Sequence, residues 1–142
     1  MSRHKPVDDH LATVPLFQGL STKQLRAVSE LMTPAEHPAG TVLTAQGDTG
    51  DEFYVILEGD AEVREDDAVI ATLSPGSFFG EMALFLNRPR NATVVATSPV
   101  VVEVLDGDEF SKLVHEFPEI GVQIMATMAH RLNELEERAR GH

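Results

Sequence analysis

The N-terminal part of the chain carries apolar residues at helical spacing. Between Leu25 and Leu31 they recur every three residues, so that they share one face of an α-helix. Ser21, followed three residues later by Gln24, has the spacing of a capping box. Pro34 disfavours helical backbone at the residue before it. The pattern therefore predicts a helix over residues 21–32.

From residue 33 to residue 106 the pattern changes to short runs rich in Val, Ile, Phe and Thr, separated by Gly, Pro and Asp. Runs of this kind are typical of β-strands. Gly59-Asp60 separates two of the runs, as a tight hairpin needs, and Asp66-Asp67 separates the next two. We expect a small antiparallel sandwich or jelly roll, with the uniformly apolar run Phe53–Leu57 inside. The expected strands are Thr41–Thr44, Phe53–Glu58, Ala61–Glu65, Val69–Leu73, Ala92–Thr97 and Val100–Leu105.

The C-terminal part returns to a helical pattern. Asp106-Gly107-Asp108 suits the start of a helix over residues 109–117, and Pro118 suits the first turn of a second helix that runs to about Arg140. Along this second helix, apolar residues form a stripe on a charged surface. Two interpretations, which do not exclude each other, stay open: the stripe covers the barrel, or it pairs with its twin in a homodimer. The stripe comprises Ile124, Met125, Met128, Leu132 and Leu135, and a pairing seam would begin at Gly121.

Length and charge limit the number of domains that the chain can form and the partners that it can bind. A chain of 142 residues is expected to form one domain over 1–142. Its expected parts are an N-terminal helical segment at 1–32, a β barrel at 33–106 and C-terminal helices at 107–140. The 11 basic and 23 acidic residues give a net charge of −12. Nucleic acids and anionic membranes attract positive charge, so we expect this chain alone to bind neither.

Composition also bears on compartment and cofactors. The chain has no apolar run of the roughly 20 residues that a membrane span needs. Its polar first residues lack the apolar centre of a signal peptide, so a cytoplasmic protein is expected. Cysteine is absent, and the six histidines are scattered without paired spacing. We therefore expect no metal site and no cofactor, and we find no set of nucleophile and base that would indicate an enzyme.

One segment, residues 79–93, interrupts the strand pattern and carries candidate chemistry. Gly80 permits a positive φ or a close backbone approach, and a helical turn after it would present free amides to an anion. Glu81 offers a carboxylate that accepts hydrogen bonds from neighbouring hydroxyls. Arg90 offers a planar fork that matches the oxygens of a phosphate. A carboxylate for a sugar and a guanidinium for a phosphate together indicate a nucleotide cradle.

The same segment resembles the phosphate-binding cassette of the cyclic nucleotide-binding domain family. That family includes the regulatory subunits of protein kinase A, the catabolite activator protein and cyclic-nucleotide-gated channels. The sequence F-G-E-M-A-L at 79–84 and the sequence P-R-N-A-T at 89–93 match the family's two motifs, in order and at a common separation. The resemblance extends over about residues 11–138. It implies a mainly β jelly-roll barrel with N-terminal helices and C-terminal hinge and lid helices.

The resemblance also implies roles for matching positions. Glu81 would bind the ribose 2′-hydroxyl and Arg90 the cyclic phosphate. Further ligand contacts are expected from the cassette at Gly80, Met82, Ala83, Asn91 and Ala92. On the last helix, Arg131 would contact the ligand or the ribose-binding carboxylate, and Leu132 and Leu135 would cover the base.

Asn91 departs from the family pattern, in which Ala, Ser or Thr commonly follows the arginine. We expect cyclic AMP as the ligand, with cyclic GMP as the other possibility. The first hypothesis is a non-enzymatic sensor that signals to an unidentified effector through its C-terminal helices. A second hypothesis is a non-binding member that acts as a dimerisation or interaction domain. A third, a small barrel enzyme that opens the cyclic phosphate, lacks a recognisable catalytic set.

Overall fold

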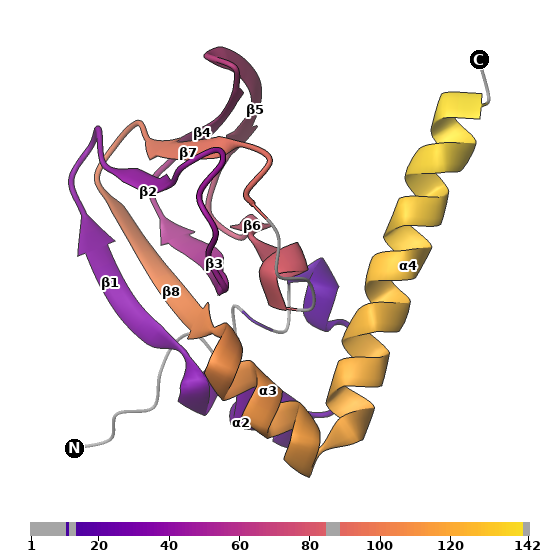
Figure 1. The fold of residues 1–142 in the computed structure, drawn as a ribbon. Coiled ribbons are helices and arrows are strands. Elements are labelled where there is room, and N and C mark those ends of the chain that lie inside the picture. Colours follow the sequence, from indigo (N-terminus) through magenta and orange to yellow (C-terminus); the bar gives the residue numbers. More distant parts are fainter. Residues whose placement is uncertain (1–10, 12–13, 85–88, 141–142) are drawn as a thin grey trace.

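The computed structural model describes Leu11, residues 14–84 and residues 89–140. Figure 1 shows a β sandwich with helices gathered at one end, and a last helix whose far end stands away from the strands. None of the helices in these ranges is long and apolar enough to cross a membrane. The helical elements are η1 (Pro15–Phe17), α2 (Thr22–Leu31), η2 (Glu81–Leu84), α3 (Gly107–Glu116) and α4 (Pro118–Arg140).

The strands form two four-stranded sheets in which every pairing is antiparallel. This is the expected jelly-roll arrangement, and each predicted strand is present to within one residue at either end. The first sheet has the order β1 (Thr33–His37), β8 (Val100–Asp106), β3 (Glu52–Glu58), β6 (Phe78–Phe79). The second has the order β2 (Val42–Thr44), β7 (Thr93–Ala96), β4 (Ala61–Glu65), β5 (Ala68–Leu73).

Strands β1 and β6 were not predicted from the sequence. Pro34 lies in β1, and a proline cannot donate to a sheet ladder. The strand forms because β1 is at the edge of its sheet and pairs with β8 alone, a position in which a missing donor is tolerated. Strand β6 has two residues, too few to show an alternating pattern.

One of the two predicted hairpin turns is present: Asp66-Asp67 joins β4 to β5, which pair with each other. The other prediction was wrong, because Gly59-Asp60 leads from β3 in the first sheet to β4 in the second. Asp66 and Asp67 both have positive φ, at 51° and 70°, as a two-residue turn matched to the strand twist requires. Gly59 has a φ of 88°, and a Cβ there would lie 2.1 Å from the carbonyl oxygen of Pro99. Only glycine fits this turn without displacing the neighbouring backbone.

Strand β3 divides the interior into two clusters because its successive side chains point to opposite faces. Phe53 and Val55 pack against the helices, in a cluster that includes Phe17 and Phe110. Tyr54 and Ile56 point between the two sheets, where Phe79, Val94 and Val102 surround them. The run from Phe53 to Ile56 is buried throughout, which confirms that the apolar segment lies inside.

The helix predictions are confirmed with one adjustment on α4. Ser21 and Gln24 form the capping box of α2 in both directions, at 3.1 and 2.8 Å. On α4, Ile120 and Ile124 are fully buried, whereas Met125 is 55% exposed. The buried face is thus rotated from the predicted stripe, because η1 and α3 cover it from one side.

Gly121, expected to begin a pairing seam, is buried in the α3–α4 contact instead. A Cβ at this position would lie 2.8 Å from Cγ1 of Val114. The glycine therefore lets α3 and α4 approach each other closely.

Candidate functional site

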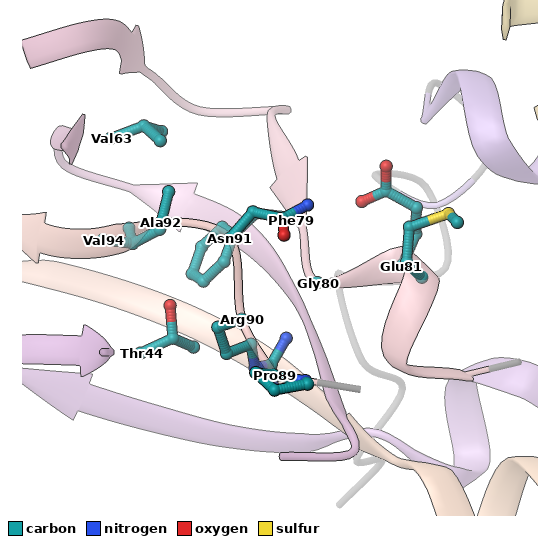
Figure 2. A pocket seen from close by; sticks show the side chains of 11 residues that line it. Thr44, Val63, Phe79, Gly80, Glu81, Pro89, Arg90, Asn91, Ala92 and Val94 are labelled. Carbon is teal, nitrogen blue, oxygen red and sulfur yellow. The ribbon is translucent and has the colours of Figure 1, made fainter. Parts of the chain in front are cut away.

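A cavity of about 220 Å³ lies between η2 and the start of β7. Its wall combines an apolar side with a polar rim, and Figure 2 shows Arg90 and Glu81 on opposite sides of Gly80. Six of the residues predicted for the ligand line it: Gly80, Glu81, Met82, Arg90, Asn91 and Ala92. Five further lining residues were not predicted: Thr44, Val63, Phe79, Pro89 and Val94.

For the other four predicted residues, the structure does not describe the side chains. Ala83 is in η2, and its side chain is outside the part that the structure describes. Arg131, Leu132 and Leu135 are in α4. Their side chains also lie outside the described part of the chain.

The loop between β2 and β3 holds the backbone of Arg90 in place. The Arg90 amide donates to the Asp48 carbonyl at 2.8 Å, and the Gly47 amide donates to the Arg90 carbonyl at 2.9 Å. Thr49 and Pro89 form an isolated bridge beside this pair. Two segments distant in sequence are therefore joined where the cavity has its polar rim.

The guanidinium of Arg90 lies in a slot between two glycines. Its Nη2 donates to the carbonyl oxygen of Glu52 at 2.9 Å. A Cβ at Gly50 would lie 3.0 Å from Nη2, and a Cβ at Gly80 would lie 2.7 Å from Nη1. Gly50 was not predicted from the sequence, since this residue has no positive φ and its small size matters only for the arginine beside it.

Gly80 is constrained by its backbone as well as by the arginine. Its φ is 84°, and a Cβ there would lie 2.6 Å from the Glu52 carbonyl oxygen. This close approach sets the position of η2, whose first residue is Glu81. The predicted glycine turn and single helical turn are thus confirmed. Glu81 is half-buried and lines the cavity.

Behind the cavity wall, Tyr54 stacks on Phe79 with ring centroids 4.7 Å apart and planes 6° apart. The Tyr54 hydroxyl lies 2.9 Å from Oε1 of Glu52 and 3.3 Å from the Leu43 carbonyl oxygen. Burial raises the pKa of Tyr54 to about 12, assisted by the hydrogen bond to Glu52 and its negative charge. The phenol therefore stays protonated at neutral pH and acts as a donor.

Three exposed carboxylates, of Asp51, Asp106 and Asp108, offer oxygens within 4.8 Å of one another. They are the described side chains that could hold a cation, although none of them lines the cavity. Desolvation, followed by the charges of Asp106 and Asp108, raises the pKa of Asp51 above its ordinary value. The cluster stands where β3 begins and α3 starts, and the Asp106 carboxylate already accepts the Asp108 amide at 3.2 Å.

Comparison with known proteins matches this architecture to one family. Residues 34–117 match the family described as "Cyclic nucleotide-binding domain". A cAMP-dependent protein kinase regulatory subunit from Mycosarcoma maydis is 43% identical over 61% of this chain and 17% of the relative. The cyclic nucleotide-gated potassium channel RHE_CH03180 from Rhizobium etli is 38% identical over 85% of this chain and 34% of the relative. The chain thus spans about a third or less of the length of these curated relatives.

Solved structures share the fold over most of the chain. The N-terminal domain of a transcriptional regulator from Streptomyces coelicolor has a TM-score of 0.82 at 28% identity, covering 92% of this chain and 94% of that one. The Thermus thermophilus catabolite activator protein has a TM-score of 0.76 at 27% identity, covering 89% and 62%. The cAMP-bound PfPKA-R has a TM-score of 0.70 at 29% identity, covering 91% and 46%.

The geometry at Gly80 predicts a large loss of stability for Gly80→Ala. A non-glycine residue at positive φ costs roughly 1–3 kcal/mol, and contact with the Glu52 carbonyl adds to this cost. Gly76→Ala is the matched control, because Gly76 has a φ of 94° with nothing within 4 Å of its Cβ position. Urea unfolding should show Gly80→Ala as the less stable variant. Equal unfolding free energies would mean that the close approach at Gly80 is not a constraint.

Proposed function

The chain belongs to the cyclic nucleotide-binding domain family, and we propose that it binds a cyclic nucleotide, cyclic AMP in the first place, in the cavity of Figure 2. The observation that carries this proposal is the Arg90 guanidinium at the rim of the cavity, with the Glu81 carboxylate on the other side of Gly80. In this proposal the domain is a sensor without catalytic activity.

The donors of Arg90 support a phosphate-binding role. A guanidinium carries five N–H donors, and among the described residues its one acceptor is the Glu52 carbonyl. The remaining donors suit the paired oxygens of a phosphate, in the planar geometry that arginine favours. The bond to Glu52 also fixes the group before a ligand arrives, which lowers the entropy lost on binding.

The rest of the cavity suits a nucleoside. Glu81 is half-buried beside the cavity, and its carboxylate accepts no hydrogen bond from the described residues. A ribose hydroxyl would supply that donor. Apolar side chains of Val63, Phe79 and Val94 form the other wall, against which the less polar faces of the ligand would lie. We further propose that Arg131, Leu132 and Leu135 of α4 contact the ribose region and the base.

Cyclic AMP is the preferred ligand on two grounds. The Mycosarcoma maydis relative is named as cAMP-dependent, and the PfPKA-R structure is described as cAMP-bound. Asn91, which is exposed at the rim of the cavity, does not by itself decide between the two bases. Cyclic GMP remains the competing ligand in the experiments below.

Leu84 offers a physical route from the cavity to the C-terminal helices. It ends η2 and packs against the cluster that contains Leu113 of α3 and Ile124 of α4. A ligand that shifts η2 would change this packing and favour one position of the helices over another. We propose that the helix movement signals to an effector protein or domain. Val122 and Met125, which are exposed on α4, are candidate contacts of a homodimer.

A thermal melt tests the binding proposal most directly. Ligand at about 100 times its dissociation constant should add about 2.7 kcal/mol to stability, which raises the Tm of a domain of this size by several degrees. We expect this shift with cyclic AMP, a smaller one with cyclic GMP and none with linear AMP. No shift at millimolar cyclic nucleotide would contradict the proposal and favour the non-binding interaction domain. Release of linear AMP from cyclic AMP would instead indicate an enzyme.

Replacing Arg90 with Ala should weaken cyclic AMP binding by roughly 2–5 kcal/mol, because the phosphate charge would be left unpaired in the cavity. The matched control is Arg64→Ala, since Arg64 is paired with Glu62 on β4 and does not line the cavity. Calorimetry should show a large loss for the first variant and an unchanged dissociation constant for the second. Equal effects would mean that only net charge matters.

Replacing Glu81 with Ala should weaken binding of cyclic AMP and leave binding of its 2′-deoxy analogue almost unchanged. The physical reason is that the carboxylate would lose the ribose hydroxyl as its donor. Glu58→Ala, at the far end of β3, removes the same charge away from the cavity. If Glu81→Ala still prefers cyclic AMP over the deoxy analogue by the wild-type factor, Glu81 does not bind the ribose.

A further inference from the structure

Glu52 contacts Arg90 through its backbone carbonyl. Its negatively charged carboxylate could pair with the same guanidinium and so compete with an anionic ligand. Its carbonyl oxygen is 2.9 Å from Nη2 of Arg90, so its own carboxylate is within side-chain reach of the same guanidinium. Yet, within the ranges that the structure describes, no ion pair joins Arg90 to this carboxylate. The carboxylate oxygen Oε1 accepts the Tyr54 hydroxyl at 2.9 Å instead.

The position of the Tyr54 side chain is fixed by burial and by ring stacking, so that its hydroxyl can hold that carboxylate. It is 7% exposed, and its ring lies flat on Phe79 at 4.7 Å. Its hydroxyl lies between Glu52 on β3 and the Leu43 carbonyl on β2. Residues i and i+2 of a strand share a face, so Tyr54 can hold the exposed Glu52 side chain on the face that the two residues share.

We propose that Tyr54 is a positioning residue, which tethers the Glu52 carboxylate and so keeps the Arg90 guanidinium available to an anionic ligand. Without the tether, Glu52 would pair with Arg90, and a phosphate would have to break that pair before it could bind. The inference rests on the proposed function for the identity of the ligand. The tether itself rests on the contacts of Tyr54, Glu52 and Arg90.

The tether can be tested without any ligand. The Nε–H resonance of Arg90, identified by its loss in Arg90→Lys, reports on the partner of the guanidinium. We expect Tyr54→Phe to shift this resonance, because the freed carboxylate moves to Arg90 while the aromatic stack is kept. The double variant Tyr54→Phe/Glu52→Gln should show the resonance where Glu52→Gln alone shows it.

Two controls accompany these spectra. Adding Glu58→Gln to Tyr54→Phe should leave the shift in place, because Glu58 is at the opposite end of the same strand. Salt at about 1 M, where the Debye length falls to roughly 3 Å, should reduce the shift. An unchanged Arg90 resonance in Tyr54→Phe would overturn the proposal, as would a shift that Glu52→Gln does not reverse.

Cyclic AMP affinity gives the second measurement. Because a partly exposed ion pair is worth at most about a factor of five in an equilibrium constant, Tyr54→Phe should weaken binding by up to about fivefold. Glu52→Gln should bind at least as tightly as wild type, and the double variant should match Glu52→Gln. A loss that Glu52→Gln does not rescue would show that Tyr54 has only a structural role. If wild type binds no cyclic nucleotide, the proposed function fails, while the ligand-free spectra still decide the tether.

Discussion

The hydrogen bond from Arg90 to the Glu52 carbonyl is the interaction around which the candidate site is built. It joins the segment after η2 to the start of β3, which are 38 residues apart in sequence. Gly50 and Gly80 flank the guanidinium, and glycine is required at position 80 because its φ is positive and a Cβ there would meet the Glu52 carbonyl. The backbone bonds of Arg90 to the loop at Gly47 and Asp48 then fix where the side chain begins.

Strand β3 connects this interaction to the remainder of the fold. Its first residue, Glu52, accepts Arg90, and the next two point to opposite faces: Phe53 to the helices and Tyr54 to the space between the sheets. A displacement of Arg90 would therefore affect both interior clusters through three successive residues, Glu52, Phe53 and Tyr54. Well-packed interiors resist continuous deformation, so this strand offers a physical route for the helix movement that we propose.

Much of this could be predicted from local sequence, and the remainder depends on contacts between distant segments. The strands with clear turn residues and the capping box of α2 follow local rules, and Gly80 and Arg90 were found through two ordered motifs. Gly50 and Tyr54 gave no such signal, because their importance lies in what approaches them after folding. Strand β1 was missed because Pro34 is unfavourable in most strands, and its edge position is a property of the whole sheet.

The negative net charge of the chain explains why the arrangement around Arg90 is needed. With 23 acidic and 11 basic residues, a guanidinium on this surface has many carboxylates that could pair with it. Long-range attraction is screened within about 10 Å at ordinary salt, so the nearest carboxylates decide whether the group is free. The Glu52 carbonyl accepts one hydrogen bond from Arg90 without neutralising it, since a carbonyl carries no net charge. An acidic protein can thus keep one positive site for an anion, provided that the carboxylate beside it has a different donor.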